Sequence, residues 1–250
     1  MTSIFASTYL SRRPIEKAMR TFAKNFSPEQ KVLDIGCGTK PYAHLFDCDY
    51  VGVDPLEIVA PDIVADAATI PVADASFDGI ILNQSLEHIS NTTGVVSEVE
   101  RILKPGGICI VTAPHTVKNH SEPIPASKAP LSHFSSEDVP YWQEDYYRFT
   151  KFGLLYLFQN FTVTKIEETS GYCGTMMQMI NYFFTSSGKM SKIFTPIYLL
   201  CNIIGKGTDL TFFFLGRKTS LSFFRKFYDL IYSSLPLNYI LVIKKNDASS

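Results

Sequence analysis

The stretch Lys31–Tyr42, KVLDIGCGTKPY, decides the fold of this chain. Its first five residues form a short apolar run that predicts a strand, and Gly36 and Gly38 after it predict a sharp turn. Glycine lets the backbone turn tightly and approach a ligand closely, so a strand that ends in G-x-G and leads into a helix is typical of a Rossmann-like nucleotide site. Asp34, just before the turn, is the feature to explain, because such turns often hold a phosphate.

Short apolar runs alternate with helix-like segments along most of the chain. Strands that alternate with helices through connections of this length predict an α/β fold with a parallel sheet and helices on both faces. Ligands of such sheets bind at the carboxyl ends of the strands. The predicted strands are 31–35, 50–54, 62–66, 77–83, 108–114, 161–169 and 237–245, with helices predicted at 41–46, 92–103 and 150–160.

Composition narrows the class of protein. A chain of 250 residues with 46% hydrophobic residues can bury a core, and a net charge of -1 gives no whole-chain signal for nucleic acid. The five cysteines are scattered without C-x-x-C spacing and the histidines lack metal-ligand spacing, so we predict neither disulfides nor a bound metal. No secretory signal or membrane-spanning run is visible, which predicts a cytoplasmic protein.

Pro41 and Asp34 argue against a dinucleotide in this site. Pro41 stands where G-x-G-x-x-G would have its third glycine, and Asp34 would bring a carboxylate near a pyrophosphate. A ligand with a positive charge and no phosphate reverses the argument, because a carboxylate at the strand end favours an ammonium group. S-adenosylmethionine is such a ligand. Asp54, at the end of the next strand, lies near the distance along the chain expected of a carboxylate that accepts both ribose hydroxyls.

Four segments, in order, resemble the successive motifs of class I S-adenosylmethionine-dependent methyltransferases of the methyltransferase type 11 group. They are VLDIGCGTKPY, YVGVDP, DIVADAATIPVADASFDGIILNQSLEHI and RILKPGGICIVTAPH, and the resemblance runs from Lys31 to about Phe161. It implies a methyltransferase enzyme with S-adenosylmethionine as cofactor and a Rossmann-like seven-stranded sheet. In that fold the last strand is antiparallel and lies between the fifth and the sixth, a place that Leu237–Lys245 would fill.

The resemblance also implies which residues hold the cofactor. Asp34 and the glycine turn line its methionine end, Asp54 holds the ribose, two residues border the adenine, and two at the end of the fourth strand lie beside the methionine portion and the sulfonium. Lys40 replaces the family's usual glycine, and its side chain could crowd the loop or repel the sulfonium. The expected cofactor residues are Asp34, Gly36, Gly38, Asp54, Asp66, Ala67, Asn83 and Gln84.

Two histidines and one polar segment are candidates for the acceptor side. His88 follows the fourth strand and His115 the fifth, so each is a candidate general base for a hydroxyl acceptor, with an ordinary loop or helix-cap histidine as the alternative. The long connection 115–149 is a candidate substrate loop. Its candidate substrate-binding residues are Asp145, Tyr146, Tyr147 and Arg148, with a lid-closing network as the alternative.

Residues 172–236 interrupt the alternation with an apolar, aromatic and basic insertion. Within it, the segment 221–232, LSFFRKFYDLIY, puts its apolar residues broadly on one face, a pattern of helices that lie on anionic membranes. The alternatives are a cap on the sheet or a homodimer contact. We therefore divide the chain into a helical extension (1–30), a methyltransferase core (31–171), a helical insertion (172–236) and a last strand with a tail (237–250).

The resulting interpretation is a cytoplasmic methyltransferase that modifies a small-molecule, saccharide or lipid-linked acceptor at oxygen, with peripheral contact to the inner face of the membrane left open. The segment YWQEDYYRFTKFGLLYLF resembles part of a subgroup that often occurs among bacterial surface-glycan genes. The alternative is a non-catalytic binding or scaffold module, which Lys40 favours and the acids Asp34, Asp54 and Asp66 oppose. Nucleic acid is a poorer candidate partner, because no basic face accompanies the motifs.

Overall fold

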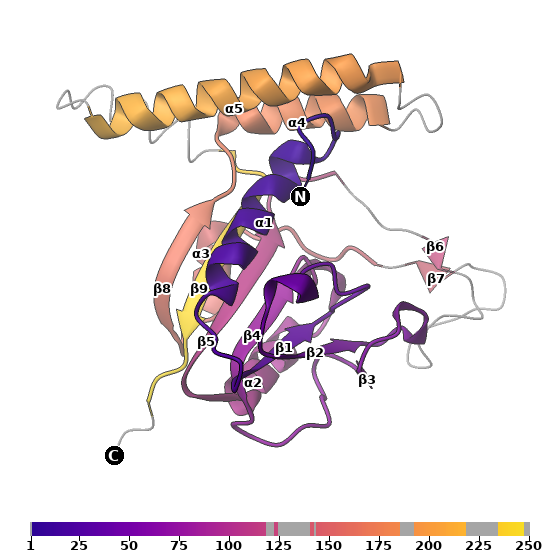
Figure 1. Ribbon diagram of the computed structural model, residues 1–250, viewed down its shortest axis with the longest axis vertical. Helices are drawn as coiled ribbons and strands as arrows, with labels where there is room; N and C mark the ends of the chain where they lie inside the picture. The colour runs from indigo at the N-terminus through magenta and orange to yellow at the C-terminus, as the bar shows by residue number, and fades with distance from the viewer. Residues whose placement is uncertain are drawn as a thin grey trace. The chain divides into compact units, whose positions relative to one another are not determined.

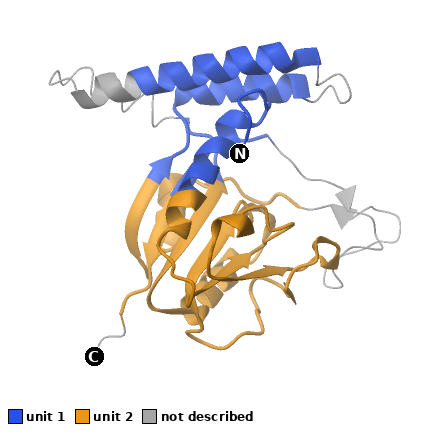
Figure 2. Cartoon of the chain, in the orientation of Figure 1, with its two compact units in different colours: residues 1–18, 114–118, 167–240 blue, residues 19–113, 119–166, 241–250 orange. Residues whose placement is uncertain are grey.

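A computed structural model describes residues 2–118, 123–124, 141–142, 144–185, 193–218 and 235–247, with side chains for all of these except 123–124, 141–142 and 212–218. The chain divides into two compact units (Figure 2). Unit 1 comprises residues 1–18, 114–118 and 167–240, and unit 2 comprises residues 19–113, 119–166 and 241–250. The domain boundaries expected from the sequence remain a prediction.

Seven strands form one sheet in the order β3-β2-β1-β4-β5-β9-β8 (Figure 1). The strands from β3 to β5 in this order pair in parallel. The sheet confirms the predicted seven-stranded, Rossmann-like α/β fold. Its strands are β1 (Lys31–Ile35), β2 (Asp49–Asp54), β3 (Ile63–Val64), β4 (Phe77–Asn83), β5 (Leu103–Pro114), β8 (Thr162–Glu168) and β9 (Asn238–Lys244), and β6 (Pro123–Ile124) and β7 (Tyr141–Trp142) form a separate antiparallel pair.

Strand β9 reverses the direction of the sheet. At one end of its ladder with β5, Gly106 N–H donates to Lys245 O over 3.1 Å, and at the other end His115 N–H donates to Leu237 O over 2.9 Å. The start of β5 therefore meets the end of β9, which makes the pair antiparallel. The last strand lies between the fifth and the sixth, as the resemblance implied.

The longest described helix is α5, with 24 residues in unit 1. In α2, Asn91 caps the amino end by accepting from Gly94 N–H over 3.0 Å, and Val95, Val99 and Ile102 on its predicted apolar face are 0% exposed. No described helix is long and apolar enough to cross a membrane. The helices are α1 (Tyr9–Ala23), α2 (Thr92–Ile102), α3 (Lys151–Leu157), α4 (Tyr172–Thr185) and α5 (Thr195–Lys218), with 3-10 helices η1 (Ala43–Leu45), η2 (Glu57–Val59) and η3 (Leu86–His88).

The prediction of a helix at 41–46, after the glycine turn, is wrong. A single 3-10 turn, η1, takes its place, and Phe46 is already extended, with φ -107° and ψ 124°. The Phe46 ring is buried and packs 6.5 Å from the Phe22 ring and 5.3 Å from the Tyr50 ring, measured between centroids. Burial of this ring draws the chain into β2 before a longer helix can form.

The predicted start of the fifth strand is also wrong. The segment Lys104–Gly107 was expected to end a helix ahead of a strand at residue 108, yet β5 begins at Leu103. Leu103 is 0% exposed and has an extended backbone, with φ -69° and ψ 131°. Burial of its side chain starts the strand early, and the glycines then lie inside the strand.

Candidate cofactor site

The turn after β1 is held by the neighbouring strand. Gly36 N–H and Cys37 N–H both donate to Val53 O of β2, over 2.8 and 3.0 Å. Gly36 has a φ of +73°, and a Cβ added to it would lie 2.6 Å from Ser85 Cβ. Gly38 has a φ of +49°, but an added Cβ there would have no atom within 4 Å. Gly36 is thus required by packing, whereas Gly38 borders open space.

Asp34 is a buried acid with spare hydrogen-bonding capacity. It is 3% exposed, and its Oδ2 accepts a hydrogen bond from Tyr50 OH. Its Oδ1 is buried and accepts no hydrogen bond from the described residues. The buried Ser85 hydroxyl also has no hydrogen-bond partner among them. Burial and the nearby Asp54 raise the pKa of Asp34 to about 7, although the hydrogen bond from Tyr50 acts to lower it. Such atoms point to a bound ligand.

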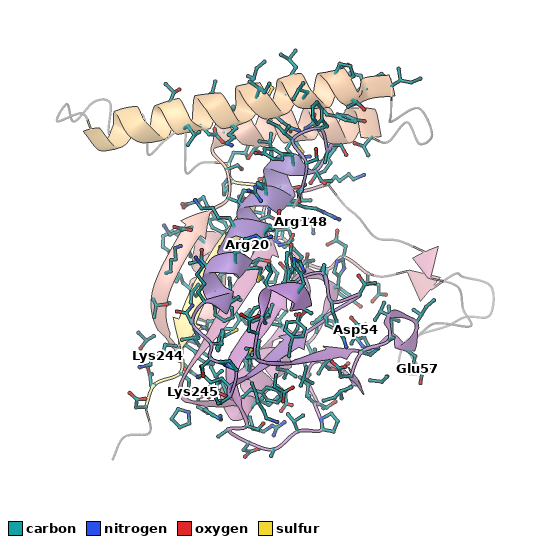
Figure 3. The ribbon with its side chains drawn as sticks, viewed as in Figure 1. Arg20, Asp54, Glu57, Arg148, Lys244 and Lys245 are labelled. Carbon is teal, nitrogen blue, oxygen red and sulfur yellow. The ribbon has the colours of Figure 1, made fainter. Side chains whose placement is uncertain are left out.

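Asp54 is oriented by backbone amides on both of its oxygens. Its Oδ2 accepts from Gly38 N–H and its Oδ1 from Leu56 N–H, each over 3.0 Å. Figure 3 labels this side chain near the end of β2. An ionised carboxylate has about four lone-pair positions, so two remain for further donors such as a pair of hydroxyls.

Lys40 is anchored on Asp62. Lys40 has a φ of +54°, the left-handed backbone that explains why glycine is usual at this position. Its Nζ donates to Asp62 Oδ1 over 2.6 Å, and Gly52 N–H donates to Asp62 Oδ2 over 2.6 Å. The hydrogen bond from Lys40 lowers the pKa of the Asp62 carboxyl group. The Lys40 ammonium group thus forms an ion pair with the Asp62 carboxylate.

The expected adenine residues lie in a turn. Asp66 Oδ1 accepts from Ala68 N–H over 2.7 Å, and Asp66 O accepts from Thr69 N–H over 3.1 Å. Ala67 is 8% exposed. The turn fixes this backbone locally, and the adenine role of Asp66 and Ala67 stays a prediction.

The expected residues at the end of β4 share one partner on β5. Thr112 Oγ1 donates to Asn83 Oδ1 over 2.8 Å and accepts from Gln84 Nε2 over 3.3 Å. Gln84 has a φ of +51°, and its N–H donates to Thr112 O over 2.9 Å. Sequence reasoning missed Ser85, Tyr50 and Thr112. The available signal for Thr112 was a polar residue inside the apolar run ICIVTAP.

His88 joins η3 to the segment that follows the long connection. Its Nδ1 lies 2.6 Å from Glu144 O, and because a carbonyl only accepts, Nδ1 carries the proton. Its Nε2 lies 4.0 Å from an oxygen of Glu87, which is 0% exposed. Burial and the nearby Asp145 raise the pKa of Glu87 to about 8, and Arg148 opposes the shift. Nε2 is therefore the ring nitrogen that can accept a proton.

The candidate acceptor residues form a local network. Arg148 holds Asp145 through two hydrogen bonds, of which Nη2 to Oδ2 spans 2.5 Å. Tyr146 N–H donates to Glu87 O over 2.7 Å, and Tyr147 OH donates to Ser90 O over 2.9 Å. The Tyr146 and Tyr147 side chains remain 42% and 37% exposed. The network fastens 144–148 to η3, and substrate binding by these residues stays a prediction.

The two candidate bases belong to different units. His115 lies in unit 1, where its ring packs edge-on, 5.5 Å from the Tyr239 ring, whereas His88 lies in unit 2. Most of the connection 115–149 and the whole interfacial segment 221–232 fall outside the described residues. Within the described part of the chain, no group of three His, Cys, Asp or Glu residues is placed to hold a metal ion.

Residues 33–111 match the methyltransferase domain family, and they lie in a sheet with the strand order expected of class I S-adenosylmethionine-dependent methyltransferases. The match bears out the predicted methyltransferase resemblance over these residues. The individual site residues and the acceptor remain predictions.

The curated relatives match only part of this chain, and the chain spans only part of them. The mouse protein named "probable tRNA methyltransferase 9B" is 34% identical over 103 residues, 36% of this chain and 23% of that protein. Demethylmenaquinone methyltransferase of Streptomyces avermitilis is 28% identical over 114 residues, 40% of this chain and 47% of that enzyme. The chain thus spans a quarter to a half of these relatives. The solved phosphoethanolamine N-methyltransferase 2 of Haemonchus contortus in complex with S-adenosyl-L-methionine shares the fold, with a TM-score of 0.52, 17% identity and coverage of 98% of this chain and 57% of that one.

We expect Gly36→Ala to lower the free energy of unfolding by about 2 to 4 kcal/mol, because the new Cβ would clash with Ser85 in a left-handed backbone. Gly38→Ala is the matched control. Its backbone is equally left-handed but open, so we expect a loss of about 1 kcal/mol. Urea unfolding of the three proteins measures both values. Equal losses would contradict the packing of Gly36 on Ser85.

We expect the affinity for S-adenosylhomocysteine to rise about fivefold from pH 6 to pH 7. With a pKa of about 7, Asp34 is ionised in about one tenth of the molecules at pH 6 and about one half at pH 7, and only the carboxylate attracts the ligand's ammonium group. Calorimetric titration at the two pH values measures the change. Asp34→Asn should bind more weakly and without this pH dependence. The same fivefold rise in the variant would assign the effect to another group.

Proposed function

We propose that this chain binds S-adenosylmethionine in unit 2 and transfers its methyl group to a hydroxyl oxygen of a small-molecule, saccharide or lipid-linked acceptor. The observation that carries the proposal is the Asp34 carboxylate, which is 3% exposed and has an oxygen that accepts no hydrogen bond from the described residues. A buried charge of this kind is costly unless it is paired. The ammonium group of the cofactor is a partner of the right charge and hydrogen-bonding type.

Asp54 and the open turn supply the rest of the cofactor contacts in this proposal. Two amides fix the Asp54 carboxylate and leave lone pairs for the two ribose hydroxyls. Open space over Gly38 lets a ligand approach the backbone. We assign the adenine to Asp66 and Ala67, and the methionine portion to Asn83 and Gln84.

His88 is the candidate that the local geometry favours as general base. S-adenosylmethionine, when bound, supplies a methyl group on a positively charged sulfur. The acceptor oxygen forms its bond to the methyl carbon as the sulfur–carbon bond breaks, so alignment supplies much of the rate. The acceptor's hydroxyl proton passes to Nε2 of His88, because the hydrogen bond to Glu144 O keeps the other ring nitrogen protonated. His115 is the second candidate.

The acceptor side is assigned to the segment after the long connection. The Asp145–Arg148 pair holds its backbone, and the exposed rings of Tyr146 and Tyr147 offer apolar surface with hydroxyl groups to a polar acceptor. A demethylmenaquinone methyltransferase among the relatives supports a small-molecule acceptor. Because one relative is named a probable tRNA methyltransferase, RNA should be included among the acceptors that are tested. We also propose that the protein is cytoplasmic and forms a homodimer. Peripheral contact with the membrane is assigned to unit 1.

A binding or scaffold module without methyl transfer is the second candidate function. Lys40, in place of glycine, favoured it, since a lysine in the loop would repel a sulfonium. The ion pair of Lys40 with Asp62 weakens this argument, because the ammonium is already neutralised by a carboxylate. Cofactor binding alone does not separate the two functions, so turnover must be measured as well.

We expect S-adenosylhomocysteine to bind the wild-type protein in the micromolar range and NAD not to bind. Asp54→Ala should abolish measurable binding, because the ribose loses both acceptors. Lys40→Gly should change the affinity by less than about threefold, since Lys40 is anchored on Asp62. Calorimetric titration measures these affinities for the wild-type protein with S-adenosylhomocysteine and with NAD, and for each variant with S-adenosylhomocysteine. Binding that appears only in Lys40→Gly would mean that Lys40 closes the site and would favour the scaffold function.

We expect His88→Ala to reduce turnover by about 100-fold or more, since a positioned base contributes about 10²- to 10⁴-fold. His88→Gln is the control, because its amide can still donate to Glu144 O but cannot take a proton. Formation of S-adenosylhomocysteine with a panel of hydroxyl acceptors measures turnover, with His115→Ala in parallel. Activity retained in His88→Gln would reduce His88 to a positioning residue, and losses below tenfold in both alanine variants would remove the base from the mechanism.

A further inference from the structure

We propose that the outer face of helices α4 and α5 docks on an anionic lipid bilayer, with the helices lying along the membrane surface. The outer face consists of Met176, Ile180 and Phe183 on α4 and Leu200, Ile203 and Ile204 on α5. The inference concerns unit 1 and stands independently of methyl transfer.

The two helices place their polar side chains at their mutual contact. Asn181 Nδ2 of α4 donates to Asn202 Oδ1 of α5 over 2.9 Å, and both side chains are 0% exposed. Asn202 and the fully buried Gln178 also donate to backbone carbonyls within residues 4–7. The inner side of the helix pair therefore mixes these hydrogen-bonded amides with buried rings such as Tyr182 and Tyr198 and with Met177, which packs on Tyr9 and Leu10.

Small residues let the helices approach closely. A Cβ added to Gly205 of α5 would lie 3.1 Å from Gly174 Cα of α4. Figure 1 shows the two helices side by side along their length. Close contact through glycine and the hydrogen bond between buried amides hold α4 and α5 together as one pair.

The outward side is apolar. Leu200, Ile203 and Ile204 are 58%, 53% and 42% exposed and recur at helical spacing on α5. On α4, Met176, Ile180 and Phe183 follow at i, i+4 and i+7 and are also exposed. More than half of the exposed large apolar side chains among the described residues lie in 172–210. A helix pair that faces water usually carries polar residues on its outward side, whereas this pair exposes apolar ones.

The charge of this region selects the kind of surface. The sequence 175–235 holds seven Lys or Arg residues and only two acids, and Lys206 is the one of these basic residues whose side chain the structure describes. One of those acids, Asp209, faces inward, with Oδ2 accepting from Gly171 N–H over 2.7 Å and Oδ1 from Gly174 N–H over 3.2 Å. An exposed apolar face within a segment whose sequence is basic complements a bilayer with anionic headgroups, and such a face lies in the membrane interface.

Vesicle sedimentation with the full chain tests this proposal. We expect the wild-type protein to pellet with phosphatidylcholine vesicles that contain about one third phosphatidylglycerol, and to pellet at least about fivefold less with pure phosphatidylcholine. The double variant Ile203→Gln/Ile204→Gln should lose at least about fivefold of the anionic binding. Both side chains are exposed, so the fold should persist.

Phe152→Gln is the matched control, because Phe152 is 78% exposed on α3 in unit 2 and should not alter vesicle binding. Binding of S-adenosylhomocysteine by each variant checks the fold and separates failure of this proposal from failure of the cofactor site. Equal pelleting of the wild type and the double variant overturns the proposal. A dimer in sedimentation velocity that the double variant splits, without vesicle binding, also overturns it and assigns the face to a second copy of the chain.

Discussion

The two hydrogen bonds from Gly36 and Cys37 to Val53 O are the constraint on which the candidate site depends. They join the end of β1 to the end of β2, so the chain has to turn within two residues. The turn places Gly36 against Ser85, which follows β4 and precedes η3, and a side chain at Gly36 would not fit there. Because parallel strands end at one edge of a sheet, this single turn gathers Asp34, the glycines and the start of η3 at the same edge.

Electrostatics explain why that edge suits a cationic ligand. Asp34 and Asp54 are both buried there, and the charge of Asp54 raises the pKa of Asp34 on top of burial. Two carboxylates in low dielectric repel each other, and a ligand with an ammonium group relieves the repulsion. Lys40 offers only part of this compensation, since its ammonium is bound to Asp62. The negative charge of Asp34 and Asp54 is therefore only partly compensated in the folded chain, and a positively charged amino acid group can compensate the rest.

The two units differ in the polarity of what their helices and strands bury and expose. In unit 2 the strands bury aliphatic residues such as Val32 and Ile81, as expected of a protein core in water. In unit 1 the helices α4 and α5 bury Asn181 and Asn202 and expose aliphatic side chains. One chain thus combines a conventional cofactor-binding core with a helix pair whose polarity suits a lipid surface. This combination gives a physical reason to consider lipid-linked acceptors.

The sequence by itself determined the strands, the glycine turn and α2, because period-two and helical apolar patterns record which side chains are buried. It also gave the acids Asp34 and Asp54 their place at strand ends. Only the tertiary structure decided the rest. Packing of Phe46 on Phe22 removed the helix expected after the turn. Long-range hydrogen bonds fixed which nitrogen of His88 carries the proton, and a local sequence pattern cannot encode a partner 56 residues away.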